Sequence, residues 1–520
     1  MNRGRTAALF VLAFVLRLGN RALFYDLHPD KIRQITAAGN LLRGRGIADC
    51  WVEAADLARV SCEPQTLWPA GYPLLSAALT SLTGNFIVTD ALLGAIALVL
   101  VLLAANGLIR RFQTGSGDET AYRWFLVFSA IGFAPYIYLT TTDFLSVGLY
   151  LTAAAGALRI VDRPPAVGTS VAVGALSWLA AVTRYNYVPL LVCIPFTLAG
   201  AGALRGDRRL FRSAAVCTGV VLLLVVAFRV ALPHNGALLG ASSSGGWYPG
   251  NLLSLDPFAA KAFLYLDPVL RRLDKIHPAL DSGVLIVAHL FALLLLAGSA
   301  AWALGTRRVT PAEADARPTA VLATVTTAAV VATLAWLSLR VTPENLPYNH
   351  HWTYLWETRY YAPALLLIVL LAFALAWSSS GGATLLVRGA RVTVAVAFLY
   401  AVAFDLWTAY TLLGRHDLSR TTLAEPAADI RVGSEVRRVA QSEQRPVVVA
   451  FPTVGEAYAA GRLRDFDFGT VRASRPVVLL VLASRDGAGA GRAAAWLDSA
   501  RAVPLIGRPG EVLFRVEVNP

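Results

Sequence analysis

Long apolar stretches separated by short polar loops dominate residues 1–412 of the chain. A helix that crosses a bilayer needs about 20 mostly apolar residues, and eleven stretches approach that length. They lie at 6–24, 86–109, 124–140, 144–160, 166–183, 187–204, 213–232, 283–304, 319–340, 360–377 and 392–412. The pattern therefore predicts a polytopic α-helical membrane protein.

The pattern changes after residue 412, where charges become frequent and the apolar runs shorten to the length of β-strands. Strand-like runs lie at 447–451, 477–483 and 512–518, and helical patterns lie between them, around 427–441, 455–461 and 491–501. Such alternation predicts a small α/β domain. We therefore expect a transmembrane domain at 1–412, with a first outer loop at 25–85, followed by a C-terminal domain at 413–520.

Arginine placement predicts the topology. A short helical pattern at 68–83 is the uncertain crossing. If it lies on the membrane surface, five arginine-bearing loops share the side of Arg3 and Arg5, as the positive-inside rule requires. Those loops contain Arg110, Arg159, Arg205, Arg307 and Arg388. We therefore expect a cytoplasmic N-terminus, an interfacial helix at 68–83 and an extracytoplasmic C-terminal domain.

Composition agrees with this reading. Hydrophobic residues make up 56% of the 520 positions and charged residues only 15%, against about 25% charged residues in soluble domains. The net charge of +13 comes with arginines clustered in short loops. Membrane lipids are therefore the expected surface partner, and nucleic acid is not.

The first outer loop contains the most informative motif, Asp30-Lys-Ile-Arg-Gln-Ile-Thr-Ala-Ala-Gly-Asn-Leu-Leu-Arg-Gly-Arg-Gly46, followed by Trp68-Pro-Ala-Gly-Tyr-Pro-Leu-Leu75. It resembles the GT-C superfamily of membrane glycosyltransferases, which includes protein mannosyltransferases and lipid A aminoarabinose transferases. Lys31 replaces the usual second acid of that motif, and Gln34 replaces its usual aromatic residue. The register is kept at Asp30, Ala38, Asn40, Leu41, Leu42, Gly44 and Gly46.

The resemblance covers about residues 1–380. It implies a GT-C-like fold in a bacterial inner membrane and an inverting glycosyltransferase. A polyprenyl-phosphate-linked sugar would be the donor, and a lipid, glycan or protein would be the acceptor. A divalent metal ion is a candidate cofactor whose need the sequence leaves open.

Asp30 and Asp143 are the candidate catalytic acids. By resemblance, Asp30 acts as the general base or positions the acceptor. Asp143 lies in Thr140-Thr-Thr-Asp143, at the predicted outer turn between two spans, where an ionisable group commonly marks a functional site. Each acid could instead cap the N-terminus of the helix that follows it.

Arg359 and Arg184 are the candidate ligands of the donor phosphate. Arg359 lies in Arg359-Tyr-Tyr-Ala-Pro363 and Arg184 in Thr183-Arg-Tyr-Asn186, and both segments resemble superfamily motifs. A guanidinium can bind phosphate oxygens through two parallel hydrogen bonds. The alternative is an interfacial arginine that extends to lipid head groups.

Aromatic residues and histidines near the predicted outer face are candidate contacts of the sugar or the acceptor. They are Tyr72, His350, His351, Trp352 and Tyr360. The alternative is an aromatic belt at the membrane interface. Adjacent histidines point in different directions, so the pair does not favour a shared metal site.

The four cysteines divide into two groups. Cys50 and Cys62 share the first outer loop and are candidates for a disulfide, which an oxidising compartment permits. Two free thiols are the alternative. Cys193 and Cys217 lie in predicted spans, where packing is the simplest role.

Two other functions compete with glycosyl transfer. A transporter or flippase for a lipid or sugar would commonly contain repeated halves with broken helices, and no internal repeat is visible. A non-catalytic membrane scaffold with an exported binding domain would tolerate the loss of Asp30.

Overall fold

The computed structural model describes most of the chain. The described residues are 2–23, 29–65, 68–111, 119–132, 141–163, 166–233, 247–248, 311–340, 358–377, 387–395, 398–399, 402, 424–451, 454–463, 470–484, 496–508 and 511–520.

The chain divides into two compact units. The helical unit comprises Met1–Leu18, Ala95–Ala231 and Leu238–Trp407. The sheet unit comprises Gly19–Gly94, Leu232–Ala237 and Thr408–Pro520. Each unit thus combines segments that are far apart in the sequence.

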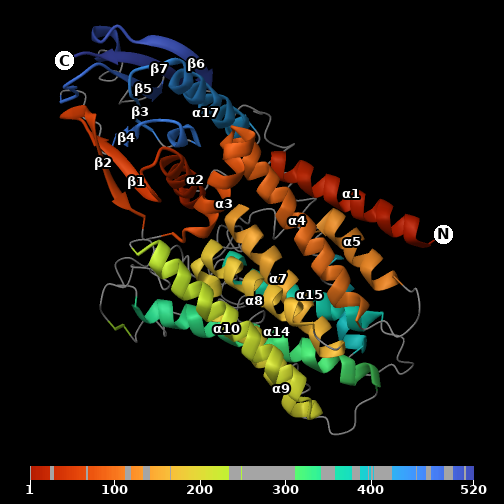
Figure 1. The fold of residues 1–520 in the computed structure, drawn as a ribbon. Helices are drawn as coiled ribbons and strands as arrows, with labels where there is room; N and C mark the ends of the chain where they lie inside the picture. Colours follow the sequence, from red (N-terminus) through yellow and green to blue (C-terminus); the bar gives the residue numbers. More distant parts are fainter. Residues whose placement is uncertain are drawn as a thin grey trace. The chain divides into compact units, whose positions relative to one another are not determined.

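The helical unit is built from apolar helices (Figure 1). Its elements include most of α1 (Asn2–Leu23), the second part of α4 (Phe86–Arg110), α5 (Thr120–Gly132), α7 (Thr141–Asp162), α8 (Val167–Thr183), η1 (Tyr185–Val192), α9 (Cys193–Arg205), α10 (Arg208–Ala231), α14 (Pro311–Arg340) and α15 (Thr358–Ala376).

Four helices within the described residues are long and apolar enough to cross a membrane: Phe86–Arg110, Thr141–Asp162, Tyr187–Arg205 and Arg208–Ala231. These helices indicate a multi-pass membrane protein. They coincide with the spans expected at 86–109, 144–160, 187–204 and 213–232.

The remaining predicted spans have different outcomes. Shorter apolar helices cover Val167–Thr183, Pro318–Thr333 and Ala362–Ala376, at three further predicted spans. Helix α1 covers most of the span expected at 6–24. The span expected at 283–304 lies outside the described residues, as do parts of those at 124–140 and 392–412. The total of eleven therefore stays a prediction.

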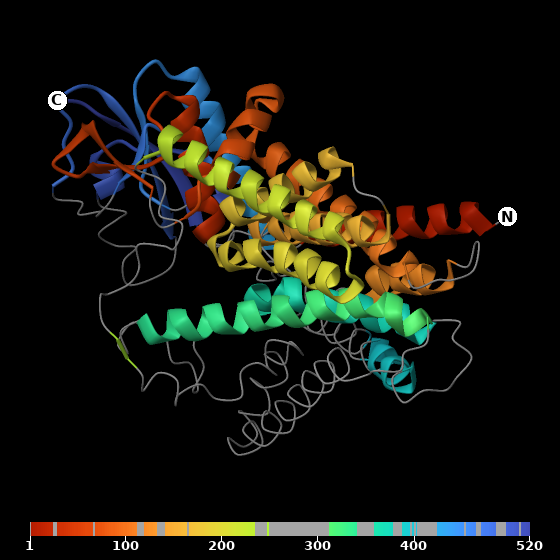
Figure 2. The same cartoon turned by 60° about the horizontal axis from the view of Figure 1, so that its bottom comes forward.

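Helix α7 lies at the centre of this unit. It packs against α8, α9, α14 and α15, and most of its side chains are buried. In contrast, α10 leaves Leu222, Leu223, Val226 and Val230 exposed. An exposed apolar stripe of this kind suits contact with lipid. Helix α14, drawn in green in Figure 2, packs against α9 and α15.

The sheet unit contains a seven-stranded mixed sheet with the strand order β2-β1-β4-β3-β5-β7-β6. Its strands are β1 (Ala48–Glu53), β2 (Asp56–Pro64), β3 (Val447–Val449), β4 (Gly461–Leu463), β5 (Val477–Ser484), β6 (Val503–Arg508) and β7 (Glu511–Val518). The C-terminal β-sheet region expected from the sequence is thus present, at β3, β5 and β7.

The first outer loop contributes two strands of this sheet. Strands β1 and β2 form an antiparallel hairpin, and β1 pairs with β4 in parallel, with Trp51 opposite Arg462. Figure 1 shows these two orange strands beside the blue C-terminal strands. A hairpin predicted only as part of a loop therefore extends the C-terminal sheet.

The sheet has an apolar core on each face because successive residues of a strand point to opposite sides. Strand β5 shows the alternation: Val477, Leu479 and Val481 belong to one core, and Val478 and Leu480 to the other. The first core also contains Val52 and Leu57 from the hairpin. The second contains Val432, Val436 and Val439 from α17 (Ala424–Ser442).

Candidate functional site

Helix α2 (Pro29–Leu42) carries the first-loop motif. It packs against α3 (Gly71–Thr83), η6 (Val454–Ala457) and β1, all within the sheet unit. From residue 31 to residue 40 only Arg33 is not fully buried. Helix α2 is therefore enclosed by protein over most of its length.

Asp30 lies in the first turn of α2 and is half-buried. Its backbone carbonyl accepts a hydrogen bond of 3.2 Å from Nε2 of Gln34. A carboxylate at this position interacts favourably with the positive end of the helix dipole. The helix thus holds the acid at its start, where the residue is half-buried.

Lys31, the next residue, points into the protein and is fully buried. Its Nζ lies 3.1 Å from Oδ2 of Asp90 in the first part of α4. The hydroxyl of Tyr72 in α3 donates a hydrogen bond to the other oxygen of the same carboxylate. Asp90 therefore joins α2, α3 and α4 through a buried polar network.

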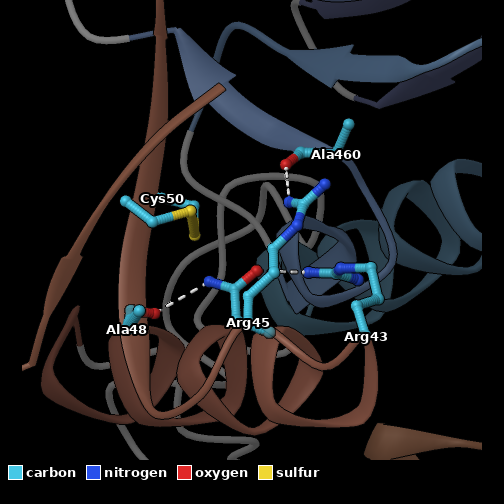
Figure 3. Close-up of a disulfide and its surroundings, with 7 residues drawn as sticks. Arg43, Arg45, Ala48, Cys50 and Ala460 are labelled. Atoms are coloured by element: carbon cyan, nitrogen blue, oxygen red, sulfur yellow. Dashed lines mark hydrogen bonds between the residues drawn. A yellow bond between two sulfur atoms is a disulfide. The ribbon is translucent and has the colours of Figure 1, made fainter. Parts of the chain in front are cut away.

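The other end of α2 is attached to the C-terminal part of the sheet unit. A Cβ on Gly39 would overlap the carbonyl oxygen of Ala457, so only glycine permits this approach. Arg43 donates a hydrogen bond to that same carbonyl oxygen, and Arg45 donates one to the carbonyl of Ala460. Figure 3 shows the Arg45 contact with Ala460.

Burial and the neighbouring charge of Arg45 lower the pKa of the Arg43 guanidinium to about 10. Burial also lowers the pKa of Arg45. The Arg43 guanidinium still carries its charge near neutral pH, and both guanidiniums donate to carbonyl oxygens. These contacts fix the end of α2 to the segment between η6 and β4.

A disulfide closes the hairpin that follows α2. Cys50 and Cys62 face each other across β1 and β2 and are linked, with their Cα atoms 4.1 Å apart. Figure 3 shows the bridge near the end of α2. The Asn40 side chain donates a hydrogen bond of 2.8 Å to the carbonyl of Ala48.

Cys193 and Cys217 are buried free thiols.

The helical unit contains a second polar centre. Asp143 lies in the first turn of α7 and is 0% exposed, and Arg184, which is 6% exposed, directly follows α8. Nε of Arg184 lies 2.7 Å from Oδ1 of Asp143. The structure thus brings a candidate acid and a candidate phosphate ligand together as a buried ion pair.

The structure describes the remaining candidate residues from the sequence to different extents. Tyr72 is fully buried against Asp90. Arg359 and Tyr360 belong to the first turn of α15, but their side chains lie outside the described residues. His350, His351 and Trp352 lie outside them entirely.

Sequence reasoning missed Asp90. It is the one acid in the 25 residues of α4, and an ionisable residue inside an apolar helix is a usable signal. Among the described residues, no group of three or more His, Cys, Asp or Glu side chains could hold a metal ion.

The chain was compared with known protein families and with curated proteins. No protein-family model matches the chain, and no curated protein matches it.

Proposed function

We propose that the chain is an inverting glycosyltransferase of a bacterial inner membrane. It would transfer a sugar from a polyprenyl phosphate to an acceptor on the outer face. Its N-terminus would be cytoplasmic and its sheet unit extracytoplasmic. The observation that carries the proposal is the half-buried Asp30 carboxylate, at the start of a helix fixed in place at both ends.

The proposed reaction needs one base and a site for the leaving phosphate. The Asp30 carboxylate takes the proton from the acceptor hydroxyl, and the acceptor oxygen attacks the anomeric carbon. The bond from that carbon to the phosphate oxygen breaks, and its electron pair leaves with the polyprenyl phosphate. Attack opposite to the leaving group inverts the anomeric centre.

Arg359 and Arg184 are proposed to hold the leaving phosphate. Phosphate oxygens form strong, charge-assisted hydrogen bonds with a guanidinium. Arg184 already lies beside Asp143, so a donor phosphate would share the guanidinium with that carboxylate. Asp143 would then keep Arg184 oriented before the donor binds.

The substitution Asp30→Asn tests the proposal. It keeps the size of the side chain but removes the base, so turnover should fall at least about a hundredfold, within the range found for general-base catalysis. The measurement uses purified full-length protein and a panel of radiolabelled polyprenyl-phosphate sugars. Release of polyprenyl phosphate is followed for each donor.

Asp49→Asn is the matched control. Asp49 lies in β1 and pairs with Arg33 of α2, and both side chains are partly exposed. An exposed pair of this kind contributes at most about 1 kcal/mol, so turnover should stay close to wild type. Wild-type turnover in a folded Asp30→Asn protein would contradict the proposal and favour a scaffold. Movement of the lipid-linked sugar without its cleavage would favour a transporter.

A further inference from the structure

The buried Lys31–Asp90 pair carries a large desolvation cost for a contact between helices. The two side chains are 1% and 3% exposed, so both charges lose their hydration when the protein folds. The attraction between buried charges often only offsets this desolvation, and apolar residues of similar volume commonly stabilise a protein equally well. Packing alone therefore does not account for the pair.

A charged pair does restrict geometry more narrowly than an apolar contact. Asp90 can accept from both Lys31 and Tyr72 only while α2 and α3 keep their positions beside α4. A rotation or a slide of α2 would leave a buried charge without its partner, which costs several kcal/mol. The network therefore selects one orientation of the first turn of α2.

Asp90 is itself held in place. The backbone N–H of Phe86, one turn earlier in α4, donates a hydrogen bond of 2.8 Å to the hydroxyl of Tyr458. The rings of Phe86 and Tyr458 also meet edge to face, with centroids 5.3 Å apart. The start of α4 is thus anchored to the same unit that fixes the far end of α2.

Asp30 and Lys31 are consecutive residues of one helical turn. Their directions differ by a constant angle of about 100°, so fixing Lys31 also fixes the direction of Asp30. We propose that Asp90 is a positioning residue that orients the Asp30 carboxylate through Lys31. This inference rests on the proposed function, in which Asp30 is the base.

The first test compares three variants of the full-length protein. Asp90→Asn removes the charge that holds Lys31. The double variant Lys31→Asp/Asp90→Lys reverses the pair, and Lys31→Met/Asp90→Leu replaces it with apolar side chains. Each variant is assayed for donor turnover with the radiolabelled polyprenyl-phosphate sugar that the wild type consumes. Thermal unfolding is measured in parallel.

A displacement near 1 Å can reduce turnover about a hundredfold. We therefore expect Asp90→Asn to lower kcat by about tenfold to a hundredfold while the KM for the donor changes less than about twofold. The reversed pair should recover most of kcat. The apolar pair should unfold at or above the wild-type temperature and yet keep a low kcat. Wild-type kcat in the apolar pair would overturn the proposal, because packing would then be sufficient.

The second test does not depend on enzyme activity. Amide hydrogen exchange in residues 30–36, followed by mass spectrometry, reports local opening of α2. Asp90→Asn should speed exchange in this segment at least about tenfold, and the reversed pair should slow it again. Unchanged exchange would overturn the positioning role. If the wild type cleaves no polyprenyl-phosphate sugar but exchange responds as expected, the proposed function fails and the coupling of Asp90 to α2 stands.

Discussion

Each of the two units is stabilised by internal contacts, and the sequence range of these contacts differs between the units. In the helical unit, helices that follow one another along the chain pack together, as α7 does with α8 and α9 does with α10. In the sheet unit, two neighbouring strands, β1 and β4, come from opposite ends of the chain, and Trp51 lies opposite Arg462. These helix pairs can form locally, whereas the pairing of β1 with β4 requires closure of a very long loop.

Among the described residues, each unit nevertheless contains a lysine or arginine that is buried against an aspartate. The helical unit pairs Arg184 with Asp143, at the ends of two consecutive helices. The sheet unit pairs Lys31 with Asp90, on helices separated by α3 and the hairpin. The comparison teaches that local pattern can single out both partners of a buried ion pair when they lie at predicted helix ends, whereas the pairing itself is visible only in the structure.

Breaking the pair in the helical unit should have the largest effect on stability. Arg184→Ala leaves the Asp143 carboxylate buried without this partner, which should lower the free energy of unfolding by about 3–5 kcal/mol. Unfolding in detergent micelles measures the loss. The double variant Asp143→Leu/Arg184→Met should regain most of it.

The exposed pair Arg438–Glu435, three residues apart in α17, supplies the control for this prediction. Exposed pairs contribute at most about 1 kcal/mol, so Arg438→Ala should change stability little. If Arg184→Ala and Arg438→Ala lowered the free energy of unfolding equally, burial would not determine how much each ion pair contributes to stability.

The close approach of α2 to η6 tests the long-range contacts of the sheet unit, because these two elements are far apart in the sequence. Gly39→Ala would place a methyl group against the Ala457 carbonyl and should lower the free energy of unfolding by about 1–3 kcal/mol. Gly219→Ala in α10 is the matched control, because nothing lies within 4 Å of a Cβ there. Denaturant unfolding should show a loss for Gly39→Ala alone.

The smallest expected effect concerns pH and the hairpin turn. Asp56 accepts hydrogen bonds from the backbone N–H and the hydroxyl of Ser474 at 2.9 Å. The backbone hydrogen bond is the main cause that lowers the pKa of Asp56 below its usual 3.8. The folded protein therefore favours the ionised carboxyl. This stabilisation is complete above the unfolded pKa and is lost as pH falls through the lower folded pKa.

Asp56→Asn should thus lower the unfolding temperature slightly near neutral pH. The difference in unfolding temperature between this variant and the wild type should become smaller below about pH 4, near the pKa of an unperturbed aspartate. Unfolding temperatures measured across this range check the prediction. Ser474→Ala keeps the backbone donor and should have a weaker effect. A gap that widens in acid would show that the ionised carboxyl does not stabilise the hairpin.

Much of the fold could be read from local pattern. Long apolar runs predicted the four membrane-length helices, and short apolar runs of strand length predicted β5 and β7, because burial of a segment leaves a run of apolar residues in the sequence. The motif at Asp30 predicted a helix with an acid at its start. Asp143 stood out as an ionisable group at the turn between two apolar spans, and Arg184 stood out because its segment resembles a superfamily motif.

Other features depended on contacts between distant segments. The hairpin at β1 and β2 contains no signal for its pairing with β4, since strand pairing uses backbone groups that every residue carries. Nor did the pattern indicate that Lys31, Tyr72 and Asp90 would meet.

The sequence by itself therefore determined the four membrane-length helices, the strands β3, β5 and β7, and the positions of the candidate acids and arginines along the chain. Tertiary structure decided that α2 is enclosed, that Arg184 faces Asp143, and that the first loop and the C-terminal region share one sheet. The physical reason is that hydrophobic periodicity is a local property of the chain. The partner of a buried charge or of a strand edge is instead chosen by the closure of long loops and by the desolvation that only a completed contact can offset.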